Sequence, residues 1–253
     1  MGSQVPILEM SGRSDVGCAR EHNEDSIAWN DTMGLAMLAD GMGGHNAGEV
    51  ASALAIEILH GLLLDLPGEN REQENALKNA VADANIAILD KAGTQPTYYG
   101  MGTTLAVAIF RTDEVLIGHV GDSRVYRFRG GSLERLTSDH SLLQELVDGG
   151  FMSADEAAES VNKNVITRAL GIEPTVAMDV KRYALLPGDV YLLCSDGLTD
   201  MVRDNDIAKL LTENMDNVDA AAEQLVATAN LNGGKDNISV ILIRVKRLAP
   251  RTA

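Results

Sequence analysis

The chain is poor in aromatic residues, in cysteine and in positive charge. Phe, Trp and Tyr make up 4% of its 253 residues, so its core must be built from Ala, Leu, Ile and Val. Its two cysteines, Cys18 and Cys194, lie in or beside apolar runs, which predicts two small buried side chains in a reducing cytoplasm rather than a disulfide. Lys and Arg number 21 against 37 Asp and Glu, a formal charge of −16, which argues against a nucleic-acid partner.

Long hydrophobic runs are also absent. The longest, Ile56 to Leu66, is interrupted by Glu57, His60 and Asp65, so no segment is expected to span a membrane. The N-terminus lacks the basic-then-apolar pattern of a signal peptide, and the chain is therefore expected in the cytoplasm. No linker, repeat or low-complexity tract divides the sequence, so we predict a single domain over residues 1–253.

Short apolar runs come in pairs that are separated by turns. The pairs are 26–29 with 34–39, 103–110 with 115–120, and 123–129 with 132–137. Connections this short join antiparallel neighbours, because parallel strands need a much longer crossover. The β-branched run at 237–245 predicts a final strand.

Four segments have apolar residues at helical spacing. In the first pair, over 47–66 and 71–93, these residues are Val50, Leu54, Ile58 and Leu62, then Leu77, Val81, Ile86 and Leu89. We expect the apolar stripe of the first helix to face the core, and Gly93 to stop the second helix. A second pair spans 204–214 and 218–234. Grouped strands and paired helices predict an α+β fold, with two packed antiparallel β-sheets flanked by helix pairs, an α-β-β-α sandwich.

The stretch 140–169 interrupts the series of strands. It is polar, acidic and less regular than its surroundings, and it contains the segments "DGG", "SADEAAES" and "NKN". We interpret it as a helical insertion over one edge of the sandwich and name it the flap. Insertions of this kind often carry function.

Carboxylates stand beside the predicted strands. Asp40, Asp122 and Asp196 each follow an apolar run, Asp236 precedes the last one, and Glu24 and Asp25 precede the first. One Asp-Gly pair is usually only a turn, but strand ends of two packed sheets can converge at one edge. Six acids held together there would repel one another, and only Lys235 and Arg124 are adjacent to them in sequence. A hard divalent cation, Mg²⁺ or Mn²⁺, would compensate; neither a zinc spacing nor a calcium loop is present.

Seven ordered motifs resemble those of the bacterial metal-dependent, type-2C, protein serine/threonine phosphatases. They are "REHNEDS", "LADGMGGHNAGEVAS", "GTTL", "GHVGDSRVYRFRGGSLERLTSDHS", "NVITRALG", "YLLCSDGLTD" and "GGKDNISVILI". The resemblance covers about Gly12 to Val245. It implies the predicted sandwich fold and hydrolysis of phosphoserine and phosphothreonine by direct attack of a metal-bridging hydroxide, with no phosphoenzyme.

The resemblance also implies a two-metal site. Asp40 would bridge two Mn²⁺ or Mg²⁺ ions, and the backbone carbonyl of Gly41 would bind one of them. Asp196 and Asp236 would ligate the other. Two such ions activate water and neutralise charge on the phosphoryl oxygens.

Further residues receive roles from the same resemblance. Glu24 would act on the metal shell through water with support from Asp25, and Arg20 would hold the substrate phosphate. A third ion would fall to Asp122 together with Asp196. The flap would lie beside the active site.

Two groups could donate the proton that the leaving alkoxide needs. Relatives in higher organisms carry a histidine just after Asp-Gly, where this chain has Met42, which cannot donate a proton. We favour metal-bound water as the donor over His45, which we expect to begin a helix and face away. We interpret Ser195, His119 and His140 as structural, with His140 as a cap or hydrogen-bond partner.

Three functions remain open on the sequence. The preferred one is a phosphatase acting on a partner Ser/Thr kinase and on that kinase's substrates, as a monomer. One alternative is a non-catalytic phosphoprotein-binding sensor of the same fold, and the other is a phosphatase of small molecules. The complete ligand set favours an enzyme, and the open glycine-rich site favours protein substrates.

Overall fold

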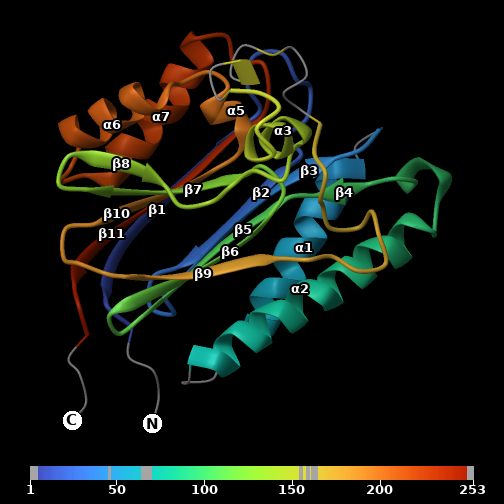
Figure 1. Cartoon of the computed structure of the whole chain (residues 1–253), viewed down its shortest axis with the longest axis horizontal. Helices are drawn as coiled ribbons and strands as arrows, with labels where there is room; N and C mark the ends of the chain where they lie inside the picture. Colours follow the sequence, from blue (N-terminus) through green and yellow to red (C-terminus); the bar gives the residue numbers. More distant parts are fainter. Residues whose placement is uncertain are drawn as a thin grey trace.

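The computed structural model describes residues 5–44, 47–63, 70–153, 156–157, 160 and 165–249. These residues form four layers in the order helices, sheet, sheet, helices (Figure 1). The predicted α-β-β-α sandwich is confirmed. In the described part of the chain, no helix is long and apolar enough to cross a membrane.

One sheet, sheet A, has the strand order β1-β11-β10-β7-β8 with antiparallel pairing throughout. Its strands are β1 (Ile7–Asp15), β7 (Arg124–Arg129), β8 (Ser132–Arg135), β10 (Val190–Cys194) and β11 (Ile238–Arg247). Three helices cover its outer face (Figure 1), namely α5 (Asp196–Thr199), α6 (Asp204–Glu213) and α7 (Val218–Leu231).

The other sheet, sheet B, has the order β2-β3-β5-β6-β9, and the short strand β4 pairs with β3. Its strands are β2 (Asp25–Asn30), β3 (Leu35–Met42), β4 (Gly102–Thr103), β5 (Leu105–Arg111), β6 (Glu114–Val120) and β9 (Asp179–Ala184). The helices α1 (Ala47–Leu63) and α2 (Asn70–Ala92) cover its outer face (Figure 1). The 3₁₀ turn η1 (Pro96–Tyr98) follows α2.

Strand β3 shows how the layers are built. Leu35, Met37 and Ala39 join the core under α1 and α2, whereas Ala36 and Leu38 join the core between the sheets. Successive side chains of a strand point to opposite faces, so a strand that is apolar throughout can be buried on both. The small alanines allow close packing, which suits a chain with so few aromatic residues.

The predicted core stripe of α1 is confirmed except at its end, and the buried face of the helix extends beyond it. Its buried positions are Ala47, Gly48, Ala51, Ser52, Ala55, Leu59 and Leu63. Val50, Leu54 and Ile58 of the predicted stripe are partly buried against the same core, whereas Leu62 at its end is 51% exposed. The small residues let the helix approach β3 closely, so they are the most deeply buried. In α2, Ile86 is likewise exposed, whereas Ile88 is buried.

Two strands and one cysteine were also missed. The edge strands β1 and β9 were not predicted. Exposed sheet edges often carry charge, and β9 contains Asp179, Lys181 and Arg182, so it lacks the apolar pattern that predicts a strand. Cys194 is buried in β10 as predicted. Cys18 is exposed, since it lies in a turn after β1 rather than in a strand, so its predicted burial was wrong.

The flap begins with a short helix. Ser141 caps α3 (Leu142–Asp148), its side chain accepting a hydrogen bond from the Gln144 backbone N–H. This agrees with the predicted helical content at that point. Residues 154–155, 158–159 and 161–164 of the flap lie outside the described residues.

Candidate active site

Contacts of acidic residues connect the two sheets beside their apolar core. Asp25 is the first residue of β2 and pairs with Asp40 in β3. From the end of β10, Ser195 Oγ donates to Asp25 Oδ2 at 2.9 Å, and Asp196 follows as the first residue of α5. The sequence placed Asp40 at the end of its strand and Asp25 before one. Asp40 lies inside β3 instead, because pairing with β4 extends that strand to Met42, and Asp25 begins β2 by pairing with Asp40.

The backbone of Asp40 is fixed by two buried threonines. Thr103 Oγ1 and the Thr104 N–H both donate to the Asp40 carbonyl, at 2.9 and 2.8 Å. The Asp40 N–H in turn donates to Thr104 Oγ1 at 3.0 Å. These contacts hold the carboxylate-bearing residue rigidly at the edge of the sheet.

Glycine is required where α1 begins. A Cβ on Gly41 would overlap the carbonyl oxygen of Gly48 in α1 and lie 2.5 Å from the Glu24 carbonyl oxygen. A Cβ on Gly48 would lie 2.8 Å from the Glu24 carboxyl carbon. Side chains here would push apart the start of α1, the end of β3 and Glu24. The glycine-rich segment therefore allows these backbones and acids to crowd together.

The carboxylates raise one another's pKa. Burial raises the pKa of Asp40 well above its usual range, and the charges of Asp25, Asp196, Asp122 and Asp236 raise it further. Burial and the same kind of repulsion, first from Asp122, raise the pKa of Asp196. The pKa of Asp25 rises to about 6, chiefly through burial. The acids that the sequence places beside strands therefore lie close enough to raise one another's pKa.

Asp122 lies in the turn between β6 and β7. It is buried, and burial followed by the charge of Asp139 raises its pKa to about 6. Ser123 Oγ lies 2.7 Å from Thr104 Oγ1, which links this turn to the backbone contacts of Asp40. Thus the Asp122 turn is connected to the threonine contacts that hold the backbone of Asp40.

One carboxylate oxygen of the group has no partner. Asp25 Oδ1 is buried without a hydrogen bond, and its other oxygen accepts from Ser195. An unpaired buried charged oxygen is costly unless a cation or solvent satisfies it. Oxygen donors surrounded by uncompensated negative charge suit Mg²⁺ or Mn²⁺, so these residues fit the metals expected from the sequence.

Arg20 approaches the group from the loop before β2. Its Nη2 lies 2.7 Å from Asp236 Oδ2, and Asp236 Oδ1 accepts from the Asn237 N–H at 2.8 Å. Arg124, which stands two residues after Asp122 in sequence, pairs with Asp139 at 2.6 Å instead. Among the described residues, Arg20 is thus the cation paired with a predicted metal ligand.

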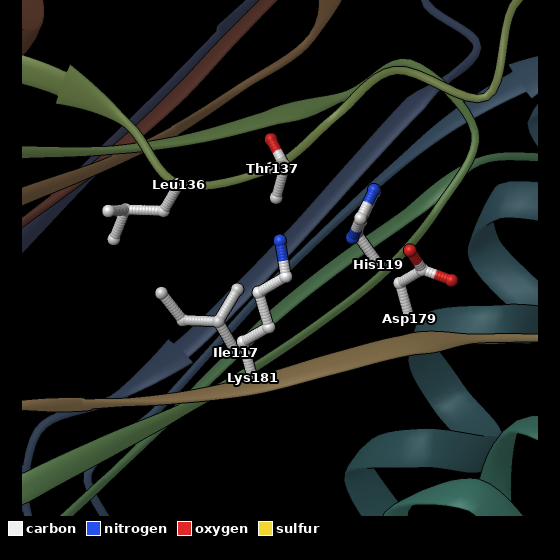
Figure 2. A pocket seen from close by; sticks show the side chains of 6 residues that line it. All are labelled: Ile117, His119, Leu136, Thr137, Asp179 and Lys181. Atoms are coloured by element: carbon white, nitrogen blue, oxygen red, sulfur yellow. The ribbon is translucent and has the colours of Figure 1, made fainter. Parts of the chain in front are cut away.

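A second cluster lies beside the Asp122 turn. His119, His140 and Asp179 are the one group of three His, Cys, Asp or Glu residues in the described chain whose ligand atoms lie within 4.8 Å of one another. His119 and Asp179 line a small pocket together with Lys181 (Figure 2). The acids around Asp40 do not reach that spacing in threes, and Asp236 is turned toward Arg20.

Proton positions argue against a metal in this second cluster. His140 Nδ1 accepts the Gly121 N–H at 3.1 Å, so Nε2 of the neutral ring carries the proton. His119 Nε2 lies 2.8 Å from the Ser138 carbonyl and must donate to it, which leaves Nδ1 as its one lone pair. Arg168 Nη1 lies 3.2 Å from Asp179 Oδ1 and balances that carboxylate. His140 is a hydrogen-bond partner, as predicted.

Several contributing residues were not singled out from the sequence. Thr103 and Thr104 hold Asp40, and Asn237 contacts the loop that carries Arg20. The only signal for them was their position inside the quoted motifs. The predicted alternative proton donor His45 lies outside the described residues.

Comparisons with known proteins agree with this architecture. A family model described as protein phosphatase 2C matches residues 18–232. The serine/threonine phosphatase stp of Listeria welshimeri is 37% identical over 236 residues, which cover 91% of this chain and 93% of that protein.

Solved structures of bacterial serine/threonine phosphatases have a similar fold. Serine/threonine phosphatase Stp1 from Staphylococcus aureus superposes with a TM-score of 0.89 at 36% identity, covering 97% of this chain and 98% of that one. The catalytic domain of the serine/threonine protein phosphatase PstP, in complex with two manganese ions, superposes with a TM-score of 0.86 at 39% identity. The match covers 95% of this chain and 99% of that one.

Proposed function

Because this chain belongs to the protein phosphatase 2C family, we propose that it hydrolyses phosphoserine and phosphothreonine monoesters in proteins. One observation carries the assignment to a metal-dependent reaction. Asp40 sits among Asp25, Asp122, Asp196 and Asp236, which all raise its pKa, and the described residues supply only Arg20 as a paired cation. Such a group is unfavourable in a folded chain unless cations complete it.

The family resemblance implies the metal ligands within this group of acids. Asp40 and the Gly41 carbonyl would hold one ion, and Asp40 with Asp196 and Asp236 would hold a second. When bound, two such ions lower the pKa of coordinated water and neutralise charge on a phosphoryl group. We expect Mn²⁺ or Mg²⁺, because all the donors are oxygen atoms.

Three more residues complete the metal surroundings. Glu24 and Asp25 would bind the metal shell through water, and the unpaired Asp25 Oδ1 is available for this. Asp122, with Asp196, would hold a third ion. The charge of Asp122 is the largest influence of a neighbour on the pKa of Asp196, which supports a shared site.

Arg20 would bind the substrate phosphate. Its side chain is 49% exposed, so it can meet a substrate from solvent while one end contacts Asp236. A guanidinium presents paired N–H donors that match phosphate oxygens, a geometry that lysine lacks. Arg20 would therefore orient the phosphoryl group over the acids.

No covalent nucleophile is assigned. Ser195 Oγ donates to Asp25 Oδ2 and accepts the Ser239 N–H at 3.0 Å, so its hydroxyl is committed to holding Asp25. Direct attack of water on phosphorus, in line with the leaving serine or threonine oxygen, needs no phosphoenzyme. Met42 has no proton to give to that leaving oxygen, so the proton would come from water, which we favour over His45.

The wider assignments rest on the family and on the sequence. We expect one phosphatase domain over residues 1–253, with the flap at 140–169 beside the site. The substrates would be a partner Ser/Thr kinase and that kinase's targets. The protein would act as a monomer in the cytoplasm, without nucleic-acid or membrane partners.

The test compares two substrates with and without metal. A phosphothreonine peptide and nitrophenyl phosphate are assayed with Mn²⁺, with Mg²⁺ and with excess chelator. We expect metal-dependent turnover of both, with a higher kcat/KM for the peptide. Binding of the peptide without turnover, by a chain that is folded and metal-loaded, would favour the sensor. A preference for small esters over every phosphopeptide would favour the small-molecule phosphatase.

A further inference from the structure

The side chain of Asn237 closes the loop that carries Arg20. Asn237 precedes β11 and is 5% exposed. Its Nδ2 donates to the carbonyl oxygens of Val16 and His22, both at 2.9 Å, and its Oδ1 accepts the Glu24 N–H at 2.8 Å. One amide therefore joins both ends of the segment 16–24.

The middle of this segment rests on the turn before β11. The backbone N–H groups of Cys18 and Ala19 both donate to the Gly234 carbonyl, at 2.7 and 3.1 Å. Gly17 has a φ of +78°, and a Cβ there would overlap the Asp236 carbonyl oxygen. The loop is thus packed against the residues that flank Asp236, and Asn237 holds its two ends.

We infer that Asn237 is a positioning residue that sets Arg20 and Glu24 relative to Asp236. The inference rests on the proposed role of Arg20 in binding phosphate. Arg20 is half exposed and contacts Asp236 only through the end of a long side chain, so its backbone must be held by other contacts. Paired guanidinium contacts depend on geometry, and small displacements of a binding group lower the rate strongly.

The chemistry of the amide explains the choice of residue. Two carbonyls need donors, and one N–H needs an acceptor. Asparagine supplies both from one short side chain, whereas aspartate supplies only acceptors and alanine neither. Asn237→Asp therefore keeps the shape and the Glu24 contact but loses both donors.

The chain offers a matched control in Asn85. It is 1% exposed, its Nδ2 donates to the Glu173 carbonyl at 2.9 Å, and its Oδ1 accepts the Gly171 N–H at 2.8 Å. It joins α2 to the segment after the flap, away from the Arg20 loop. Asn85→Ala removes a comparable buried amide and should cost comparable stability.

The kinetic test is a double-mutant cycle with Arg20→Ala. KM for nitrophenyl phosphate and inhibition by inorganic phosphate are measured with Mn²⁺ for Asn237→Ala, Asn237→Asp and Asn85→Ala. We expect both Asn237 variants to raise KM and weaken phosphate inhibition by about tenfold, more than they lower kcat. In the Arg20→Ala background they should add less than about twofold, because the group they position is gone. Asn85→Ala should leave KM unchanged in both backgrounds.

A second readout needs no turnover. Cys18 lies in the loop and is exposed, whereas the chain's other cysteine, Cys194, is buried, so a fluorinated thiol reagent labels the loop selectively. We expect the ¹⁹F resonance of Asn237→Asp to shift and sharpen relative to the unsubstituted protein, with no change in Asn85→Ala. If one of the two Asn237 variants does not fold, the other carries both measurements.

The outcomes separate the two claims. An unchanged KM together with an unchanged ¹⁹F spectrum would overturn the positioning role, as would KM effects that add fully to Arg20→Ala. A chain without any phosphatase activity would overturn the proposed function instead. In that case the ¹⁹F spectrum and phosphate binding by calorimetry would still decide whether Asn237 holds the loop.

Discussion

Two polar clusters are connected through the Gly121–Asp122 turn. In the acidic cluster (Asp25, Asp40, Asp122, Asp196 and Asp236), the side chains have the same charge, several pKa values are raised, and one buried oxygen has no partner. In the histidine cluster (His119, His140 and Asp179), one nitrogen of each ring is paired with a backbone group and Arg168 balances the carboxylate. Burial lowers the pKa of both histidines.

The difference teaches that short distances between metal-binding side chains do not define a metal site. The histidine cluster meets the tighter spacing, yet Arg168 balances its carboxylate and its two rings keep only one lone pair, on His119 Nδ1. The acidic cluster is looser, yet its repulsion is unresolved within the described chain. What matters is the charge and the lone pairs left over after internal contacts are counted.

The largest expected effect comes from comparing one carboxylate of each cluster, Asp40 and Asp179. Asp40→Asn should lower kcat with Mn²⁺ by about 10³-fold or more, because it removes the charge proposed to bridge two ions. Asp179→Asn, its counterpart, should change kcat less than about threefold. Steady-state assays on nitrophenyl phosphate measure both. Retention of more than about a tenth of the activity by Asp40→Asn, a change of less than 1.4 kcal/mol, would contradict the two-metal assignment.

The next effect separates Arg20 from an ordinary surface ion pair. Arg20→Ala should raise KM by about 10- to 100-fold with a smaller change in kcat, because the phosphate contact exists in the ground state too. Arg13 pairs with Asp219 at the same distance, 2.7 Å, and Arg13→Ala should leave KM unchanged. Equal falls in kcat and kcat/KM for Arg20→Ala would instead indicate a contact made only in the transition state.

A smaller effect concerns the shared turn. Asp122→Ala should lower activity by about tenfold and remove one weak Mn²⁺ site, because a third ion loses its ligand. His119→Gln should keep the number of Mn²⁺ sites, since the histidine cluster binds none. Calorimetric titration of the chelator-treated proteins measures both. Identical isotherms for Asp122→Ala and the unsubstituted protein would exclude the third ion from Asp122.

The fold was largely predictable because its signals are local. Turns of a few residues imply antiparallel pairs, and the helices over 204–213 and 218–231 follow from their apolar spacing. The most deeply buried positions of α1 were not, because they are small residues packed on β3, beside the predicted stripe. The edge strand β9 has little apolar content, and it forms because β6 offers it a pairing edge.

The site was predictable in its residue types and only partly in its contacts. Acids beside strands, with a glycine at Gly41, indicated the acidic cluster. That Arg20 contacts Asp236, and that Ser195 holds Asp25, depends on how the two sheets are placed, which no local pattern encodes. Asn237 was overlooked for the same reason, since its partners lie more than 200 positions away in sequence.

The smallest expected effect uses pH to separate the clusters in the metal-free protein. Asp122 has a pKa of about 6 in the folded chain and about 4 in an unfolded one, so between these values the folded state binds more protons. Lowering the pH from 7 to 5.5 therefore stabilises the fold through Asp122. His140 has a folded pKa of about 4 against about 6.5 unfolded, so the unfolded state binds more protons and the same change destabilises the fold.

The two contributions have opposite signs and can be removed one at a time. In thermal unfolding with excess chelator, Asp122→Asn should make the Tm change from pH 7 to 5.5 more negative by about 2–4 °C, the shift for about 1 kcal/mol in a chain of this size. His140→Asn, whose amide oxygen takes the place of Nδ1 and can accept the Gly121 N–H, should make it more positive by a similar amount. Saturating Mn²⁺ should abolish the Asp122 difference, because the ions hold the carboxylates ionised, and leave the His140 difference in place. Shifts of the same sign for both variants would contradict the opposite pH dependence of stability that is predicted for the two clusters.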